Sequence, residues 1–69
     1  MAYRVMVNGE QHGEIVEGDG LDAQLAVLNA AVDVIEVPDD LRKLFMFQLA
    51  NGKYSEDSNG RRIWIEAVP

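Results

Sequence analysis

Residues 21–35 constrain the fold more than any other part of the chain, because apolar residues recur there at helical spacing. The recurring residues, at intervals of four, three, four and three, are Leu21, Leu25, Leu28, Val32 and Ile35. This spacing predicts an amphipathic helix whose apolar face points to a core. Val27 and Val34 lie off this stripe, so we expect the helix to be central to the core or to meet a second copy of itself.

The N-terminal residues predict a β-hairpin. Residues 3–7 alternate, with Tyr3, Val5 and Val7 on one face, as in a half-buried strand. Asn8-Gly9 follows directly and is a strong signal for a tight hairpin turn. Gly13 allows a longer loop, so we place the return strand at residues 14–17 and end it at Gly18-Asp19-Gly20.

The C-terminal residues predict a second hairpin, with Asn59-Gly60 as its turn between residues 53–56 and 61–68. Ile63 and Ile65 share one face of the last strand, and Trp64 lies on the other. Two alternatives remain open. Trp64 is exposed as an interface anchor if the helices cover the isoleucines, and it is a core residue if they cover the opposite face.

A second apolar run follows Pro38 and the acidic pair Asp39-Asp40. Its spacing between Leu41 and Leu49 is helical, and Asn51-Gly52 gives a stop signal. Phe45, Phe47 and Leu49 also alternate, so a strand is the rival interpretation; we favour the helix. The predicted fold is a single α+β domain over residues 1–69, with element order ββααββ and two helices packed on one face of an antiparallel sheet.

Composition narrows the classes of function. The chain has no cysteine, which excludes a disulfide scaffold and a thiol nucleophile. Its net charge of −6 argues against a nucleic-acid backbone or an anionic membrane as the main partner. No secretory signal and no apolar stretch long enough for a membrane span is visible, so we expect a cytoplasmic location.

The charge is concentrated in one part of the sequence. Residues 10–40 hold nine acids and no Lys or Arg, so residues 1–40, with Arg4, carry −8 and residues 41–69 carry +2. This asymmetry indicates a surface that docks on a basic partner. The residues that we predict to contact a protein partner are Glu14, Glu17, Asp19, Asp22, Glu36, Asp39, Asp40 and Trp64.

Residues 55–66 match part of the calcium-binding EF-hand pattern. The matching positions are Ser55, Asp57, Asn59, Gly60 and Glu66. Ser55 replaces the leading acid, however, and Ile63-Trp64-Ile65 is typical of a strand where the EF-hand requires a helix. We therefore interpret the segment as a hairpin turn and predict no metal site.

Two further features suggest chemistry only weakly. His12, between Glu10 and Glu14, could act as a general base, but no nucleophile accompanies it, so we interpret it as an exposed loop residue. Gly18 and Gly20 precede a helix as in some phosphate-binding loops, yet the neighbouring acids would repel phosphate. We predict no catalytic residue, no cofactor and no enzymatic activity.

Basic and aromatic residues gather near the C-terminus, at Lys53, Tyr54, Arg61, Arg62 and Trp64. Such a cluster suits a single-stranded nucleic acid, but the acidic half of the chain disfavours that partner. We therefore predict a small acidic module that docks on a basic surface of a larger protein and modulates or inhibits it. Its size and composition are similar to those of phage and mobile-element inhibitors. The alternative is a structural protein that acts as a homodimer or larger homo-oligomer.

Overall fold

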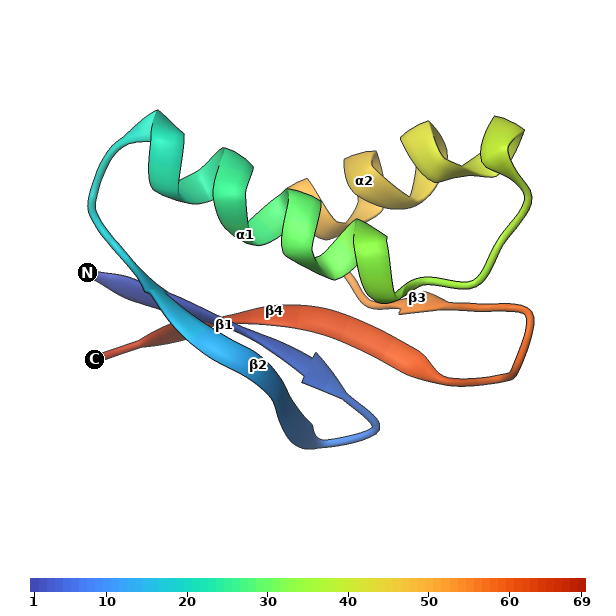
Figure 1. Cartoon of the computed structure of the whole chain (residues 1–69), viewed down its shortest axis with the longest axis horizontal. Helices are drawn as coiled ribbons and strands as arrows, with labels where there is room; N and C mark the ends of the chain where they lie inside the picture. Colours follow the sequence, from blue (N-terminus) through green and yellow to red (C-terminus); the bar gives the residue numbers. More distant parts are fainter.

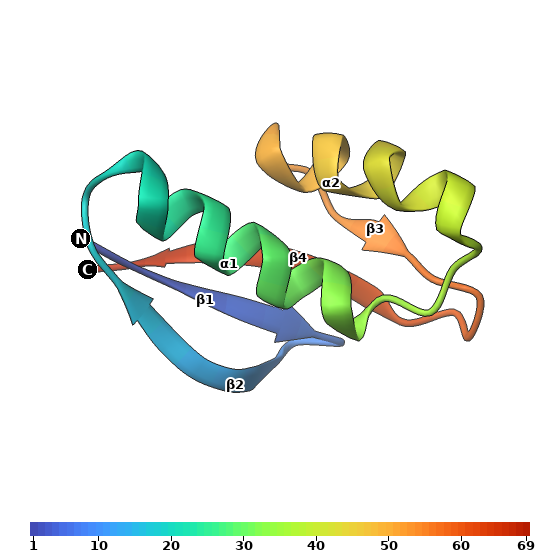
Figure 2. The same ribbon diagram turned by 45° about the horizontal axis from the view of Figure 1, so that its top comes forward.

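The computed structural model describes all of residues 1–69 and shows one four-stranded antiparallel sheet with both helices on one face (Figures 1 and 2). The elements are β1 (Ala2–Val7), β2 (Glu10–Glu17), α1 (Leu21–Val34), the 3₁₀ turn η1 (Asp39–Leu41), α2 (Arg42–Ala50), β3 (Ser55–Glu56) and β4 (Arg62–Val68). The strand order is β2-β1-β4-β3. The predicted α+β fold with order ββααββ is confirmed.

The first hairpin has a two-residue turn. Asn8 (φ 53°) and Gly9 (φ 90°) both adopt left-handed conformations, as a tight turn between antiparallel strands requires. Strand β2 therefore begins at Glu10, and the longer loop that we expected is wrong. Gly13, with φ 75°, instead lies where the pairing of β1 with β2 shifts between Tyr3 and Val5.

The core lies between the sheet and the two helices. It consists of Val5, Val27, Ala31, Val32, Ile35, Leu49 and Ile63. The predicted inward stripe of α1 is only partly correct, because Leu21 is 69% exposed and Leu25 is 46% exposed, whereas Ala23, Val27 and Ala31 are buried. The helix is apolar over a wide arc, and the face with small side chains is the one that lies against the sheet.

The second apolar run is helical, which excludes the strand alternative. Pro38 precedes the 3₁₀ turn that leads into α2, and Asn51 caps the last carbonyl groups of the helix. Gly52 follows with φ 77°, a left-handed conformation that suits glycine after a helix end. Strand β3 is shorter than predicted, because it pairs with β4 only at Ser55 and Glu56.

Candidate functional site

Six of the seven predicted acidic residues fall into two groups at opposite ends of α1, and the seventh, Glu14, lies exposed in β2. Glu17, Asp19 and Asp22 lie around the connection from β2 to α1, and Glu36, Asp39 and Asp40 lie around the connection from α1 to α2. All six are exposed. Since α1 has 14 residues, at a rise of about 1.5 Å per residue the groups are separated by roughly 20 Å. The structure therefore does not bring these acids into one patch.

Most of these acids have no cationic partner within the chain. Asp19 contacts the amino group of Met1, and Glu36 accepts a hydrogen bond from the side chain of Asn59. The predicted acids that make no ion pair are Glu14, Glu17, Asp22, Glu36, Asp39 and Asp40. These carboxylates remain available to an external cation.

The helical layer also exposes large apolar side chains. They are Leu21, Leu25, Leu41, Leu44 and Phe47, which we call the helical apolar set. Phe47 is 68% exposed and Leu44 is 51% exposed. The sequence assigned most of these residues to the core, because periodicity identifies apolar positions without showing which of them a second element covers.

Trp64 lies on the face of the sheet opposite the helices. Ile63 is buried in the core and Ile65 packs against it, so the alternation of β4 places Trp64 on the outer face. This agrees with the first of our two alternatives, although Trp64 is half-buried rather than fully exposed. It therefore lies on the opposite side of the sheet from α1, whose two ends carry the acidic groups.

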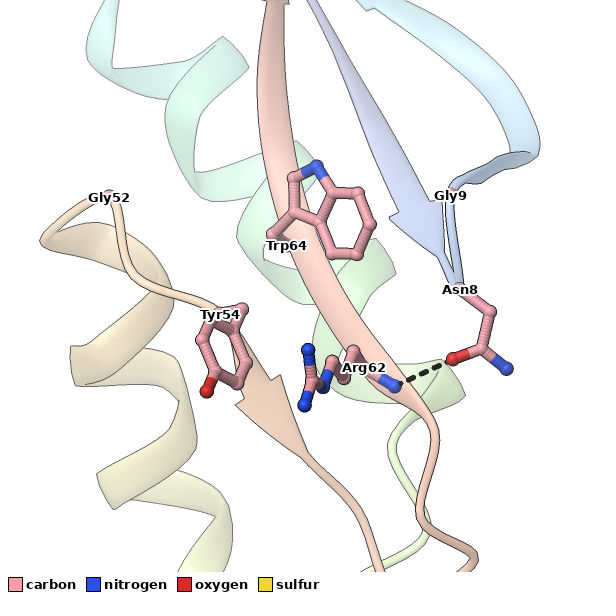
Figure 3. Close-up of a pocket in the computed structure, with 6 residues that line it drawn as sticks. All are labelled: Asn8, Gly9, Gly52, Tyr54, Arg62 and Trp64. Carbon is pink, nitrogen blue, oxygen red and sulfur yellow. Dashed lines mark hydrogen bonds between the residues drawn. The ribbon is translucent and has the colours of Figure 1, made fainter.

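An open pocket of about 580 Å³ lies on this outer face (Figure 3). It is lined by Asn8, Gly9, Gly52, Tyr54, Arg62 and Trp64. The guanidinium carbon of Arg62 lies 5.2 Å from the centroid of the Tyr54 ring, within the range of a cation–π contact. The backbone N–H of Arg62 donates to Oδ1 of Asn8 at 2.9 Å, which ties the first hairpin turn to β4.

Glu66 is held beside this pocket by donors from two residues. The indole Nε1 of Trp64 donates to Oε2 of Glu66 at 2.8 Å, and Nη2 and Nε of Arg4 donate to Oε1 at 2.7 and 3.1 Å. The hydrogen bonds from Trp64 and Arg4 lower the pKa of Glu66 below its ordinary value. The carboxylate in turn fixes the orientation of the Trp64 ring.

The basic and aromatic cluster that we considered for nucleic acid is divided in the structure. Nε and Nη2 of Arg61 donate to Oδ2 of Asp57 at 3.0 and 2.7 Å, and Nη2 also donates to the carbonyl oxygen of Val34. Arg61 is therefore committed within the fold. Tyr54, Arg62 and Trp64 line one pocket, and Nε of Arg62 lies 3.9 Å from Oε2 of Glu56.

The segment that matches part of the EF-hand pattern forms the β3–β4 hairpin, and it continues into a strand rather than a helix. Ser55 is buried and donates to Gln48 at 2.9 Å. The Asp57 carboxylate is occupied by Arg61 and by backbone N–H groups. No group of three or more His, Cys, Asp or Glu side chains is arranged to hold a metal ion.

His12 lies in β2, opposite Val5, and not in a loop as we expected. It is exposed. Gly20 is the N-cap of α1 and provides no side-chain cap. Neither position adds a catalytic constellation to the residues described above.

Comparison with protein-family models, curated proteins and solved structures finds no match to this chain. Neither helix has the length and apolar character that a membrane-spanning segment needs.

Proposed function

We propose that this chain is a small acidic protein-binding module that docks on a basic surface of a larger protein and modulates or inhibits it. The observation that supports this proposal most directly is the helical layer. It exposes the helical apolar set, and carboxylates without ion pairs lie at both ends of α1.

The two features would act at different stages of binding. Unpaired carboxylates such as Asp22, Asp39 and Asp40 raise the encounter rate with a basic surface, because the attraction acts over about a Debye length. Large side chains such as Phe47 then contribute affinity, because contact with the partner removes their apolar surface from water. The complementary surface on a partner would have basic residues around an apolar patch.

Homo-oligomerisation is the second candidate, and the exposure of Leu21 and Leu25 on α1 favours it. Two copies that met through α1 would bring their acidic groups toward one another. A dimer of this kind would therefore be more stable at high salt, whereas docking on a basic partner would be weaker at high salt. The salt dependence separates the two candidates.

The test is capture of proteins from a native lysate by the tagged chain at about 0.05 M and about 0.5 M salt, which changes the Debye length roughly threefold. We expect a specific partner with a basic surface that is lost at high salt. The double variant Asp39→Lys, Asp40→Lys should lose this partner and keep its elution volume in size exclusion. Glu10→Lys, which reverses one acid in β2 away from both groups, is the control for a change of charge elsewhere on the surface.

Two outcomes would contradict the proposal. A partner retained equally by the double variant would show that the acids are not used. A blank capture together with a defined multimer, dissociated by the variant Leu21→Gln, Leu25→Gln, would establish the structural alternative instead.

A further inference from the structure

The outer edge of β4 is open along most of its length. Strand β3 pairs with β4 only at Arg62 and Ile63, so residues 64–68 have a neighbour on the β1 side alone. The pairing with β1 is regular from Ile63 to Val68, without a bulge. This part of β4 is therefore a regular strand edge without a neighbour, of the kind that templates the addition of another strand.

The backbone groups on that edge can be assigned. The N–H and the carbonyl oxygen of Arg62 both bond to Asn8, on the β1 side. The direction of the backbone N–H and carbonyl groups alternates along a strand, so those of Ile65 and Ala67 point away from β1. The corresponding groups of Ile63 point the same way, toward β3. Two N–H donors and two carbonyl acceptors are thus free for a further strand.

The opposite edge of the sheet shows how an edge is protected. Strand β2 has an irregular register around Gly13 and carries three charged side chains, at Glu10, Glu14 and Glu17. Bulges and charges are common ways of preventing strand addition. Residues 64–68 of β4 have only one charge, at Glu66, and no bulge.

Pockets lie on both faces of the sheet beside this open edge. On the helix side, a groove of about 310 Å³ is lined mainly by apolar residues, among them Val27, Leu28, Leu49, Ile65 and Ala67. On the outer face lies the pocket of Tyr54, Arg62 and Trp64. Gly52 lines both pockets. A strand added here would send alternate side chains to the two faces.

We propose that the open edge of β4 and the apolar groove beside it bind an extended segment of a partner protein by strand addition, with apolar and basic residues alternating in the bound segment. Residues of the bound segment opposite Ile65 and Ala67 would lie on the same face of the sheet as those two side chains and would enter the groove. The residue opposite Glu66 would lie on the outer face. The Glu66 carboxylate already pairs with Arg4, so a lysine or arginine there would share this carboxylate with Arg4, and the net charge of −6 favours a basic over an acidic segment.

A second copy of this chain fits the edge less well. Antiparallel pairing of β4 with its own copy through Ile65 and Ala67 would place Glu66 directly opposite Glu66 of the other copy. Like charges directly opposite one another destabilise a strand pair. A basic segment removes this conflict. The site uses neither the helical apolar set nor the acids at the ends of α1, so it stands or fails separately from the proposed function.

The probe is a heptapeptide of alternating lysine and valine, added to the ¹⁵N-labelled full chain at about 0.5 M salt, where non-specific attraction is screened. We expect chemical-shift changes centred on the amides of Ile65 and Ala67 and slower hydrogen exchange at both. The control peptide is methylated on its valine amide nitrogens, which removes the donors that face β4 and keeps the charge. It should show no such changes.

A pair of variants tests the same edge from the side of the protein. Ala67→Pro removes an outward N–H without removing a bond to β1, and we expect the peptide to bind about tenfold more weakly. Ala67→Ser retains the N–H and should bind within about twofold of the parent chain. The amide spectrum of each variant shows whether β1 and β4 remain paired.

The proposal is overturned if the peptide does not bind, if the methylated peptide binds equally well, or if the shift changes centre on the helical apolar set and leave Ile65 and Ala67 unchanged. It is also overturned if Ile65 and Ala67 become protected as the concentration of the chain alone is raised. That result would make a second copy the occupant of the edge.

Discussion

The guanidinium group of Arg61 joins the buried carboxylate of Asp57 to the C-terminal end of α1. It donates to Oδ2 of Asp57 at 2.7 Å and to the carbonyl oxygen of Val34 at 2.7 Å. Helix α1 has no basic residue in its own last turn. Arg61 supplies the cation that the negative end of the helix dipole favours, and thereby fixes the β3–β4 hairpin against α1.

Replacing Asp57 should destabilise the fold. Asp57→Ala leaves Arg61 and the backbone N–H groups of Asn59 and Arg61 without their acceptor. Because the Arg61 side chain is 30% exposed, water compensates part of the loss, and we expect a cost of about 1–3 kcal/mol in urea unfolding. Glu56→Ala, at an exposed neighbouring position, should change stability by less than about 0.5 kcal/mol. Equal effects would show that the Asp57–Arg61 pair does not hold the hairpin.

Asp57 also predicts how stability responds to acid. Burial raises the pKa of Asp57, but hydrogen bonds from Arg61, Glu36 and Asn59 outweigh burial and hold it below its ordinary value of 3.8. The folded state therefore binds the proton less tightly than the unfolded state does. The stability that ionised Asp57 contributes is present above pH 3.8 and is lost as the pH falls through the lowered pKa. Urea midpoints measured between about pH 2 and pH 6 should fall more steeply for the parent chain than for Asp57→Asn.

The sequence predicts the elements of this fold well because their signals are local. Each signal involves only residues that are close together in the sequence. The signals are the turn dipeptides Asn8-Gly9 and Asn59-Gly60 and the helical spacing of residues 21–35. The predicted element order and the single helical face of the sheet are correct for this reason.

Features that depend on distant neighbours were not predictable in the same way. The spacing of Asp57 and Arg61 is visible in the sequence, but the hydrogen bond from Arg61 to Val34 joins residues 27 positions apart. The exposure of Leu21 depends on which face of α1 meets the sheet. The open edge of β4 depends on the strand order and on the shortness of β3.

Two leucines of α2 should respond very differently to truncation. Leu49 is 3% exposed and belongs to the core, whereas Leu44 is 51% exposed. We expect Leu49→Ala to cost about 2–5 kcal/mol, because it removes buried apolar area and leaves a cavity. Leu44→Ala should cost about 0.5 kcal/mol or less. Chemical unfolding of both variants measures the difference, and a large cost at Leu44 would place that side chain in an interface already present in the free protein.

Two glycines before α1 form a second matched pair. Gly18 has φ 140°, and a Cβ added there would lie 2.9 Å from the Cβ of Ala23. Gly20 has φ −95° and open space at the same position. Gly18→Ala should destabilise the chain by about 1–3 kcal/mol through backbone strain and this close contact, and Gly20→Ala should stay within about 0.5 kcal/mol. Similar melting temperatures for the two variants would contradict the tight approach of the β2–α1 connection to the helix.

Trp64 should report the protonation of Glu66. The hydrogen bonds from the Trp64 indole and from Arg4 lower the pKa of Glu66 below its ordinary value of 4.5. Protonation removes the charge that orients the indole, so Trp64 fluorescence, from the only tryptophan in the chain, should change at a pH below 4.5. Glu66→Gln should abolish this step and keep its circular dichroism spectrum. A fluorescence step that persists in Glu66→Gln would have to arise from another carboxylate, and Asp57→Asn would then identify whether acid opening of the hairpin is its source.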